Sequence, residues 1–233
     1  MKKVVIILVF LSFVMIDFAH TKIFYADGPK DVKKISLTFD DGPGKSTAKI
    51  LEILKEKNVK ATFFMLGIRV QNDPDTAKAV AVAGHEIGNH TYGHINFYAY
   101  KGEDKIDKMK KEILRGKNII KKVTGIDPFL VRFSYGYSRF DAIEVIRNSG
   151  CYLINWSFGC DWTAVTAEEM HNKYKKALKN GVIFLMHDLP KNKKVLSFLS
   201  SFIDEIIEAG YEIVPVSQLL NIEQVCTNRA DEL

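Results

Sequence analysis

Short apolar stretches, rich in β-branched and aromatic residues, alternate along the chain with segments in which apolar residues recur every three or four positions. The first pattern is typical of buried β-strands, and the second is typical of amphipathic helices. Strands are predicted at residues 35–39, 61–66, 85–89, 129–133, 152–156, 182–186 and 211–215. One helix is predicted after a Ser46–Thr47 cap, and others at 73–83, about 104–123, 138–149, 166–180 and 193–209.

Strands that alternate with helices indicate an α/β fold with a parallel sheet, and nearly continuous apolar strands indicate that both faces are covered. The sheet can close into a β/α barrel or stay open and doubly wound. In either case ligands bind at the carboxyl ends of the strands. The polar residues that follow successive strands are Asp40-Asp41, Asn89-His90, Arg132, Asp161-Trp162 and His187-Asp188.

The first residues differ from the rest of the chain. Lys2 and Lys3 precede an apolar run from Val4 to Ile16, which is the pattern of a secretory signal and is short for a membrane span. We therefore expect a signal segment at 1–19 and a single folded domain at 20–233, since 233 residues can bury one substantial core. No Ala-x-Ala cleavage site is present, so an uncleaved membrane anchor remains an alternative.

The last four residues, Ala-Asp-Glu-Leu, resemble the retrieval address of the endoplasmic reticulum. With the signal segment, they predict a protein of the secretory pathway, either retrieved or delivered to the cell surface or wall. Cys151, Cys160 and Cys226 show no metal-binding spacing. We expect one disulfide, with Cys160–Cys226 as the candidate pair, or else three buried thiols.

The net charge is +5, and much of the positive charge falls on residues 101–122, with nine Lys or Arg against four acids. Such a segment could bind an anionic polymer or a membrane surface. We interpret it as a solvated outer helix that turns Ile106, Met109, Ile113 and Ile120 inward. No helix-turn-helix, RNA-recognition or zinc-finger spacing is present, so nucleic acid is not expected as a partner.

Two adjacent aspartates end the first predicted strand, in LTFDDGPGKST at 37–47. Neighbouring carboxylates repel each other and neither is favoured in a buried strand, so a cation is expected to hold them. One aspartate can ligate a metal while the other serves as a general base. A turn capped by Asx hydrogen bonds would explain one of the two residues but not both.

His90 and His94 lie four residues apart, a spacing that places both imidazoles on one face of a helical turn. A single His-x-x-x-His is a weak signal by itself. It gains weight because it follows a strand end on the same rim as Asp41. Two histidines and one carboxylate leave coordination positions open, as catalytic metal sites do.

Five motifs follow one another along the chain: TFDDGP at 38–43, HTYGH at 90–94, RFSYG at 132–136, DW at 161–162 and LMH at 185–187. In this order they resemble the polysaccharide deacetylase family, carbohydrate esterase family four, over roughly residues 33–220. The resemblance implies a distorted barrel of seven parallel strands with outer helices. It also implies the removal of acetyl groups from N-acetylated sugar polymers.

The resemblance implies that Asp41, His90 and His94 bind a divalent metal. Zinc suits this ligand set, and cobalt, nickel or manganese could also fit it. Asp40 would be the base that activates water, and His187 would protonate the leaving amine.

Other matched residues would support the reaction. Arg132 would orient the base, and Asp161 would in turn hold Arg132. The backbone N–H of Tyr135 would stabilise the oxyanion. Trp162 and Leu185 would form the apolar slot for the acetyl methyl group.

Two departures from the family pattern fall in loops that contact substrate: Ser134 replaces a usual proline, and Phe158 replaces an aspartate. We expect a metal-dependent enzyme that deacetylates N-acetylglucosamine polymers of the chitin type. The alternatives are a deacetylase of another sugar such as that of peptidoglycan, a catalytically impaired glycan-binding relative, and an amide hydrolase of small N-acetyl compounds.

Overall fold

The computed structural model describes residues 22–189 and 193–224, in which eight strands form a sheet whose pairs are all parallel. The order is β1-β6-β5-β4-β3-β2-β7, and β8 pairs with the first residues of β2. The strands are β1 (Phe24–Tyr25), β2 (Lys34–Gly42), β3 (Thr62–Met65), β4 (Glu86–Asn89), β5 (Leu130–Val131), β6 (Tyr152–Ile154), β7 (Ile183–His187) and β8 (Glu212–Ile213).

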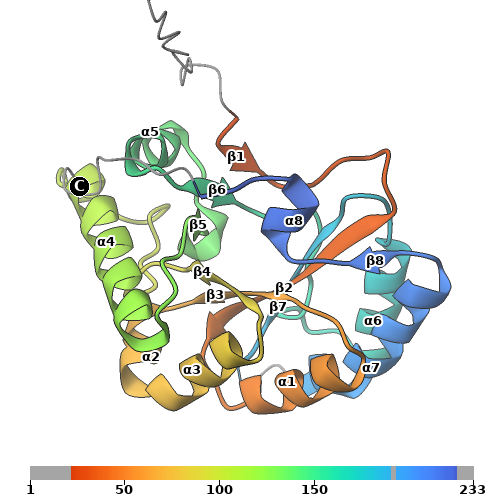
Figure 1. The fold of residues 1–233 in the computed structure, drawn as a ribbon. Coiled ribbons are helices and arrows are strands. Elements are labelled where there is room, and N and C mark those ends of the chain that lie inside the picture. Colours follow the sequence, from red (N-terminus) through yellow and green to blue (C-terminus); the bar gives the residue numbers. More distant parts are fainter. Residues whose placement is uncertain (1–21, 190–192, 225–233) are drawn as a thin grey trace, which may run out of the picture.

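Helices surround the strands, as Figure 1 shows for α1 to α4, α6 and α7. Strand β2 is buried on both faces from Ile35 to Gly42, as the apolar strand sequences predict. The helices are α1 (Thr47–Glu56), α2 (Gly67–Asn72), α3 (Pro74–Val82), α4 (Lys105–Thr124), α5 (Phe140–Ser149), α6 (Ala167–Lys176), α7 (Lys193–Glu208) and α8 (Val216–Leu220).

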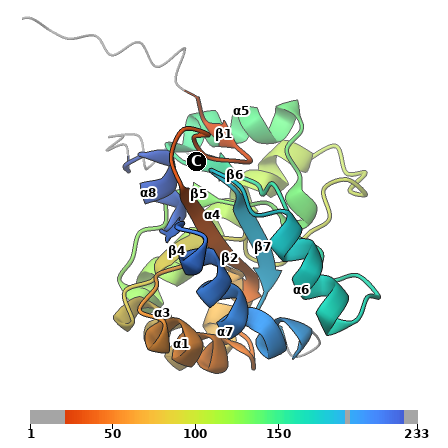
Figure 2. The ribbon, with the colours of Figure 1, turned by 90° about the vertical axis from the view of Figure 1, so that its right-hand side faces the viewer.

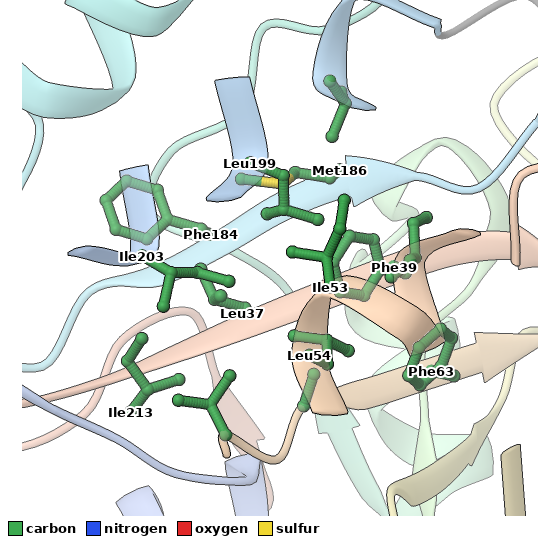
Figure 3. Packing of buried hydrophobic residues seen from close by; sticks show 14 of the residues in the cluster. Leu37, Phe39, Ile53, Leu54, Phe63, Phe184, Met186, Leu199, Ile203 and Ile213 are labelled. Carbon is green, nitrogen blue, oxygen red and sulfur yellow. The ribbon is translucent and has the colours of Figure 1, made fainter. Parts of the chain in front are cut away.

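Strand β2 pairs with β3 on one side and with β7 on the other, and Figure 2 shows it beside β7. Its side chains alternate between two environments. Leu37 and Phe39 pack against residues of α1, α7 and β7 in the main apolar core (Figure 3). Thr38 and Asp40 project to the opposite face, where both accept hydrogen bonds from Arg132. One strand therefore builds the core on one face and the polar interior on the other.

The main core lies between the sheet and the helices α1 and α7. Ile53 and Leu54 of α1 and Leu199 and Ile203 of α7 converge on β2 (Figure 3). Each of these side chains is 6% exposed or less. Burying such a side chain contributes about 1.5–3 kcal/mol, so this cluster fixes β2 firmly.

All seven predicted strands are present, and the α/β fold with a distorted barrel of parallel strands and outer helices is confirmed. The ring is incomplete, because the segment after β6 meets β7 only at an isolated bridge between Phe158 and Phe184. Strand β1 and helices α2 and α8 were not predicted. They are short, and β1 forms only because its two residues pair with β6.

No helix in the described ranges is long and apolar enough to cross a membrane. The signal segment at 1–19 and the C-terminal Ala-Asp-Glu-Leu lie outside the described residues, as does Cys226 of the candidate disulfide. Cys151 and Cys160 are both buried free thiols. A disulfide between these two residues is therefore excluded.

Candidate functional site

An open cavity of about 600 Å³ lies at the carboxyl ends of the strands. Its position agrees with the rule for parallel α/β sheets. Every residue predicted for the site lines this cavity except Arg132, which is fully buried beneath it. The lining residues are Asp40, Asp41, His90, His94, Tyr135, Gly136, Trp156, Asp161, Trp162, Thr163, Leu185, His187 and Lys194.

The two adjacent aspartates lie at a β-bulge near the end of β2. Asp40 is in register with His187 of β7, but the pairing with β3 shifts between Asp40 and Gly42. Asp41 takes up the extra position with a left-handed φ of 71°. The bulge directs the two side chains to different partners, so that Asp40 meets Arg132 and Asp41 meets the two histidines.

Asp40 and Arg132 form a buried ion pair, with 2.7 Å between Oδ1 and Nη1. Nη1 also donates to Thr38 Oγ1 at 2.8 Å, which is a contact that the sequence did not predict. Nε and Nη2 donate to the carbonyls of Ile154 and Asn155. Arg132 therefore pairs with Asp40 as expected, and the backbone at the end of β6 holds Arg132 in place.

Asp161 does not hold Arg132, so that prediction was wrong. Its Oδ1 accepts from Nδ1 of His187 at 2.8 Å, and its Oδ2 accepts from the backbone N–H of the same residue at 2.8 Å. Burial lowers the pKa of His187, but the hydrogen bond and the charge of Asp161 outweigh it. The charges of Asp40 and Asp41 act in the same sense, and the pKa is raised to about 9. A protonated imidazole is the form that can donate a proton.

His90 and His94 converge on Asp41, but the predicted helical turn is absent. Residues 90–94 form a loop in which Thr91 and His94 have left-handed φ values of 69° and 59°. Nε2 of His94 lies 3.0 Å from Asp41 Oδ1, and Nε2 of His90 lies 3.4 Å from the same atom. The spacing of four residues brings the imidazoles together through loop geometry.

These three side chains fit a divalent metal. Their ligand atoms lie within 4.8 Å of one another, and Asp41 Oδ1 is buried without accepting a hydrogen bond. Nδ1 of His90 lies 2.7 Å from the backbone carbonyl oxygen of Arg132. Because a carbonyl oxygen can only accept, Nδ1 carries the proton, and the lone pair of the neutral imidazole is on Nε2, where it can bind a metal. Burial raises the pKa of Asp41, but the two imidazoles outweigh it and hold this pKa well below its usual range.

Three aromatic side chains, Tyr135, Trp156 and Trp162, and one leucine line the cavity with apolar surface. The ring of Tyr135 lies 4.9 Å from that of His94, and the ring of Trp162 lies 5.8 Å from that of His187. Tyr135 and Trp162 are 56% and 55% exposed, whereas Leu185 is 2% exposed. Leu185 and Trp162 can therefore form the predicted slot, and the backbone of Tyr135 has a left-handed φ of 61°.

The residues that depart from the family pattern remain close to the site. Ser134 is fully buried in the short 3-10 turn η2 (Ser134–Gly136), and its hydroxyl has no hydrogen-bond partner. Phe158 packs edge-on against Tyr174 and Phe184 and forms the bridge to β7. Phe158 thus serves in packing, and Ser134 is buried in the turn that carries Tyr135.

Asp188 has a structural role that the sequence did not indicate. It is fully buried, accepts a hydrogen bond from Thr47 Oγ1, and leaves no room for a side chain at Gly42. Burial is the largest cause that raises the pKa of Asp188 to about 7, and the charges of Asp41 and Asp40 raise it further. The turn after the two aspartates is therefore packed closely against the end of β7.

An Asp-His-His ligand set beside a carboxylate held by arginine and a histidine held by aspartate defines the class of hydrolytic sites that combine a metal with acid–base residues. Comparison with known proteins supports this class. The family model of polysaccharide deacetylases matches residues 27–154. The chain belongs to the polysaccharide deacetylase family, carbohydrate esterase family four.

Several relatives are bacterial. A peptidoglycan-N-acetylglucosamine deacetylase from Bacillus cereus is 36% identical over 197 residues, which cover 82% of this chain and 90% of that protein. The peptidoglycan-N-acetylglucosamine deacetylase PgdA from Listeria monocytogenes is 33% identical over 82% of this chain and 39% of its own length. This chain thus matches most of the first relative and a minor part of the second.

Solved structures share the fold. A peptidoglycan N-acetylglucosamine deacetylase in complex with an N-oxidanyl-benzamide compound superposes with a TM-score of 0.81 at 28% identity, covering 87% of this chain and 95% of that one. A family-four pseudoenzyme from Bacillus anthracis gives a TM-score of 0.79 at 25% identity, covering 88% and 71%. The fold therefore occurs both in a deacetylase and in a pseudoenzyme.

Proposed function

We propose that this chain is a metal-dependent N-deacetylase that acts on N-acetylglucosamine residues of a polysaccharide, with peptidoglycan as the first candidate substrate. The observation that carries the proposal is the joint presence of the Asp41-His90-His94 cluster, the Asp40–Arg132 pair and the Asp161–His187 pair in one cavity. The predicted chitin-type substrate becomes the second candidate, because the relatives described above are named for peptidoglycan.

In the proposed reaction a divalent ion held by Asp41, His90 and His94 would supply Lewis-acid polarisation of the acetyl carbonyl. Asp40 takes a proton from the attacking water, and the arginine keeps this carboxylate in position. The carbon–nitrogen bond of the tetrahedral intermediate then breaks. His187 gives its proton to the departing amine, so that acetate and a free amino sugar leave.

The walls of the cavity would position the acetyl group. Leu185 and Trp162 offer apolar surface to its methyl, and the backbone N–H of Tyr135 is the proposed donor to the developing oxyanion. The cavity is open and larger than an acetyl group, which suits entry of a polymer from the side. We further propose that the chain acts outside the cytoplasm, where the wall polymer lies.

The test is acetate release by the purified chain from peptidoglycan glycan strands and from chitin oligomers, before and after removal and restoration of the metal. Release from the first substrate that depends on metal is the expected result, and Asp40→Asn serves as the inactive control. Release from chitin oligomers alone would overturn the choice of polymer. Metal-independent release at the wild-type rate would overturn the mechanism.

A second candidate is a relative that binds the glycan without turnover. The similar pseudoenzyme and the substituted Ser134 favour this reading, whereas the presence of every proposed ligand and of both acid–base residues argues against it. Retention of glycan strands without acetate release, by protein with bound metal, would support it.

A further inference from the structure

The loop that carries both histidine ligands has an unusual backbone. Thr91 and His94 have left-handed φ values, and Gly93 lies between them and directly precedes His94. Non-glycine residues adopt this conformation only when surrounding contacts hold them there. The orientation of the His94 imidazole therefore depends on groups that fix the peptide bonds of this loop.

One such group is a buried carboxylate on α4. Glu112 is 6% exposed, and its Oε2 accepts a hydrogen bond from the backbone N–H of Gly93 at 2.6 Å. Among the residues that the structure describes, Glu112 forms no ion pair with a lysine or arginine. The basic composition of residues 101–122 predicted only solvated charges, and Glu112 is the exception.

Burying a carboxylate without a cationic partner costs several kcal/mol, so packing alone does not account for Glu112 on the inner face of this helix. A hydrogen bond from an amide to an ionised carboxylate is shorter and stronger than one to a neutral acceptor. Such a bond is well suited to hold a single peptide unit in a conformation that it would otherwise leave.

The same stretch of α4 contacts the loop at neighbouring points. Asn89 donates to the carbonyl of Ile113 at 2.8 Å and accepts from the N–H of Thr91 at 3.0 Å. Arg115 donates to the hydroxyl of Tyr92 at 2.8 Å, with its guanidinium 3.5 Å from the centre of the ring. This surface of α4 therefore holds the loop in place at several positions.

We propose that Glu112 is a positioning residue for the metal site. Its carboxylate fixes the amide of Gly93 and so holds His94 in the left-handed conformation that presents Nε2 toward Asp41. This inference rests on the proposed metal site and extends it to a residue that touches neither metal nor substrate. Residues that orient a metal ligand commonly contribute roughly 10–100-fold to affinity.

The experiment measures the affinity of the purified chain for cobalt(II), by its visible absorption in competition with a chelator. Glu112→Met, which removes the acceptor, is expected to weaken affinity roughly 10–100-fold. Glu112→Gln, which keeps an oxygen acceptor, is expected to lose much less. Glu144→Met provides the matched control, since Glu144 is exposed on α5, and should bind as the wild type does.

Wild-type affinity in Glu112→Met would overturn the proposal, as would an equal loss in Glu112→Gln and Glu112→Met. If the methionine variant does not fold, Glu112→Asp is tested in its place, because it keeps the carboxyl group on a side chain that is one methylene shorter. That variant should bind cobalt more weakly while its metal-free thermal midpoint changes little. Failure of the wild-type chain to bind cobalt would instead overturn the proposed function itself.

Discussion

The guanidinium of Arg132 donates to Asp40, to Thr38 and to two backbone carbonyls at the end of β6, and the backbone carbonyl of Arg132 accepts from His90. One buried residue therefore connects the proposed base with a proposed metal ligand. The guanidinium carbon of Arg132 also lies 4.0 Å from the centre of the Phe64 ring. This contact leaves the guanidinium little freedom to move. Site geometry at this scale depends on four hydrogen bonds that one guanidinium donates.

Replacement of Asp40 by asparagine tests the proposed base. The amide oxygen can still accept from Arg132, but the side chain can no longer take a proton from water. We expect turnover to fall by roughly 10²–10⁴-fold with metal content unchanged. Acetate release and bound metal are measured in parallel, with the exposed Asp75→Asn as control. Full activity in Asp40→Asn would rule out its role as base.

The Asp161–His187 pair predicts a pH dependence of turnover. With the pKa of His187 raised to about 9, the imidazole is protonated below that pH and loses its proton as the pH rises through it. Turnover should therefore fall on the alkaline side near pH 9. In Asp161→Asn this fall should move to lower pH, because the raising charge is gone. A profile of kcat against pH that is identical in both proteins would contradict the assignment.

Residue types at the site could be predicted from the sequence, but their pairing was predicted less well. The motifs identified Asp41, His90 and His94, and the structure brings them together. Asp161 was assigned to Arg132, although its carboxylate hydrogen-bonds His187. The error has a physical reason. The segment after β6 is brought next to β7 by the isolated bridge between Phe158 and Phe184, and no local sequence pattern predicts that long-range contact.

Among the secondary-structure elements, β2 and the helices that pack on it were predicted because their apolar periodicity matches the observed burial. Helices α2 and α8 were missed, since neither is long enough to show a periodicity. Ile106 was expected to point inward but is 44% exposed, whereas Glu112 is buried. Hydrophobic pattern thus locates elements well and identifies buried polar residues poorly.

His85, directly before β4, connects this element to β3 and gives a prediction for stability. Its Nδ1 accepts from the backbone N–H of Ala61 at 3.2 Å, so the ring is neutral in the folded chain. Burial, with a smaller effect of Lys60, lowers the pKa of His85 from 6.5 to about 4. The unfolded chain therefore binds a proton in this interval that the folded chain does not.

The free energy of unfolding of metal-free protein should accordingly fall between pH 6.5 and pH 4, with about 3 kcal/mol of the loss due to His85. In His85→Asn, whose oxygen can still accept from Ala61, this part of the loss should disappear. Denaturant titrations of both proteins at several pH values measure the difference. If the free energy of unfolding falls by the same amount in both proteins between pH 6.5 and pH 4, the prediction is contradicted.

For the whole molecule, the proposed metal would bind two separate parts of the chain, the end of β2 and the loop after β4. A ligand that binds only the folded state stabilises it, by about 2.7 kcal/mol at one hundred times its dissociation constant. Cobalt at that concentration should raise the thermal midpoint by several degrees. Asp41→Ala should show no such rise, and an equal rise in both proteins would indicate binding elsewhere.

The fold class could be predicted for the whole molecule, because the alternation of strands and helices is strong along the entire chain. The polymer that it acts on could not be predicted in the same way, since one fold serves many substrates. The chitin-type expectation came from the family resemblance alone. Substrate choice depends on the residues around the cavity, and here these include the cationic Lys194 and the exposed Tyr135 and Trp162.

The position of β2 between β3 and β7 has a consequence for how the chain is made. β3 follows β2 within about twenty residues, but β7 lies more than a hundred residues further along. At roughly 5–20 residues per second, one edge of β2 stays unpaired for on the order of ten seconds before β7 emerges from the ribosome. Throughout that interval the nascent chain carries the proposed base without its proton donor, so the site can form only near the end of synthesis.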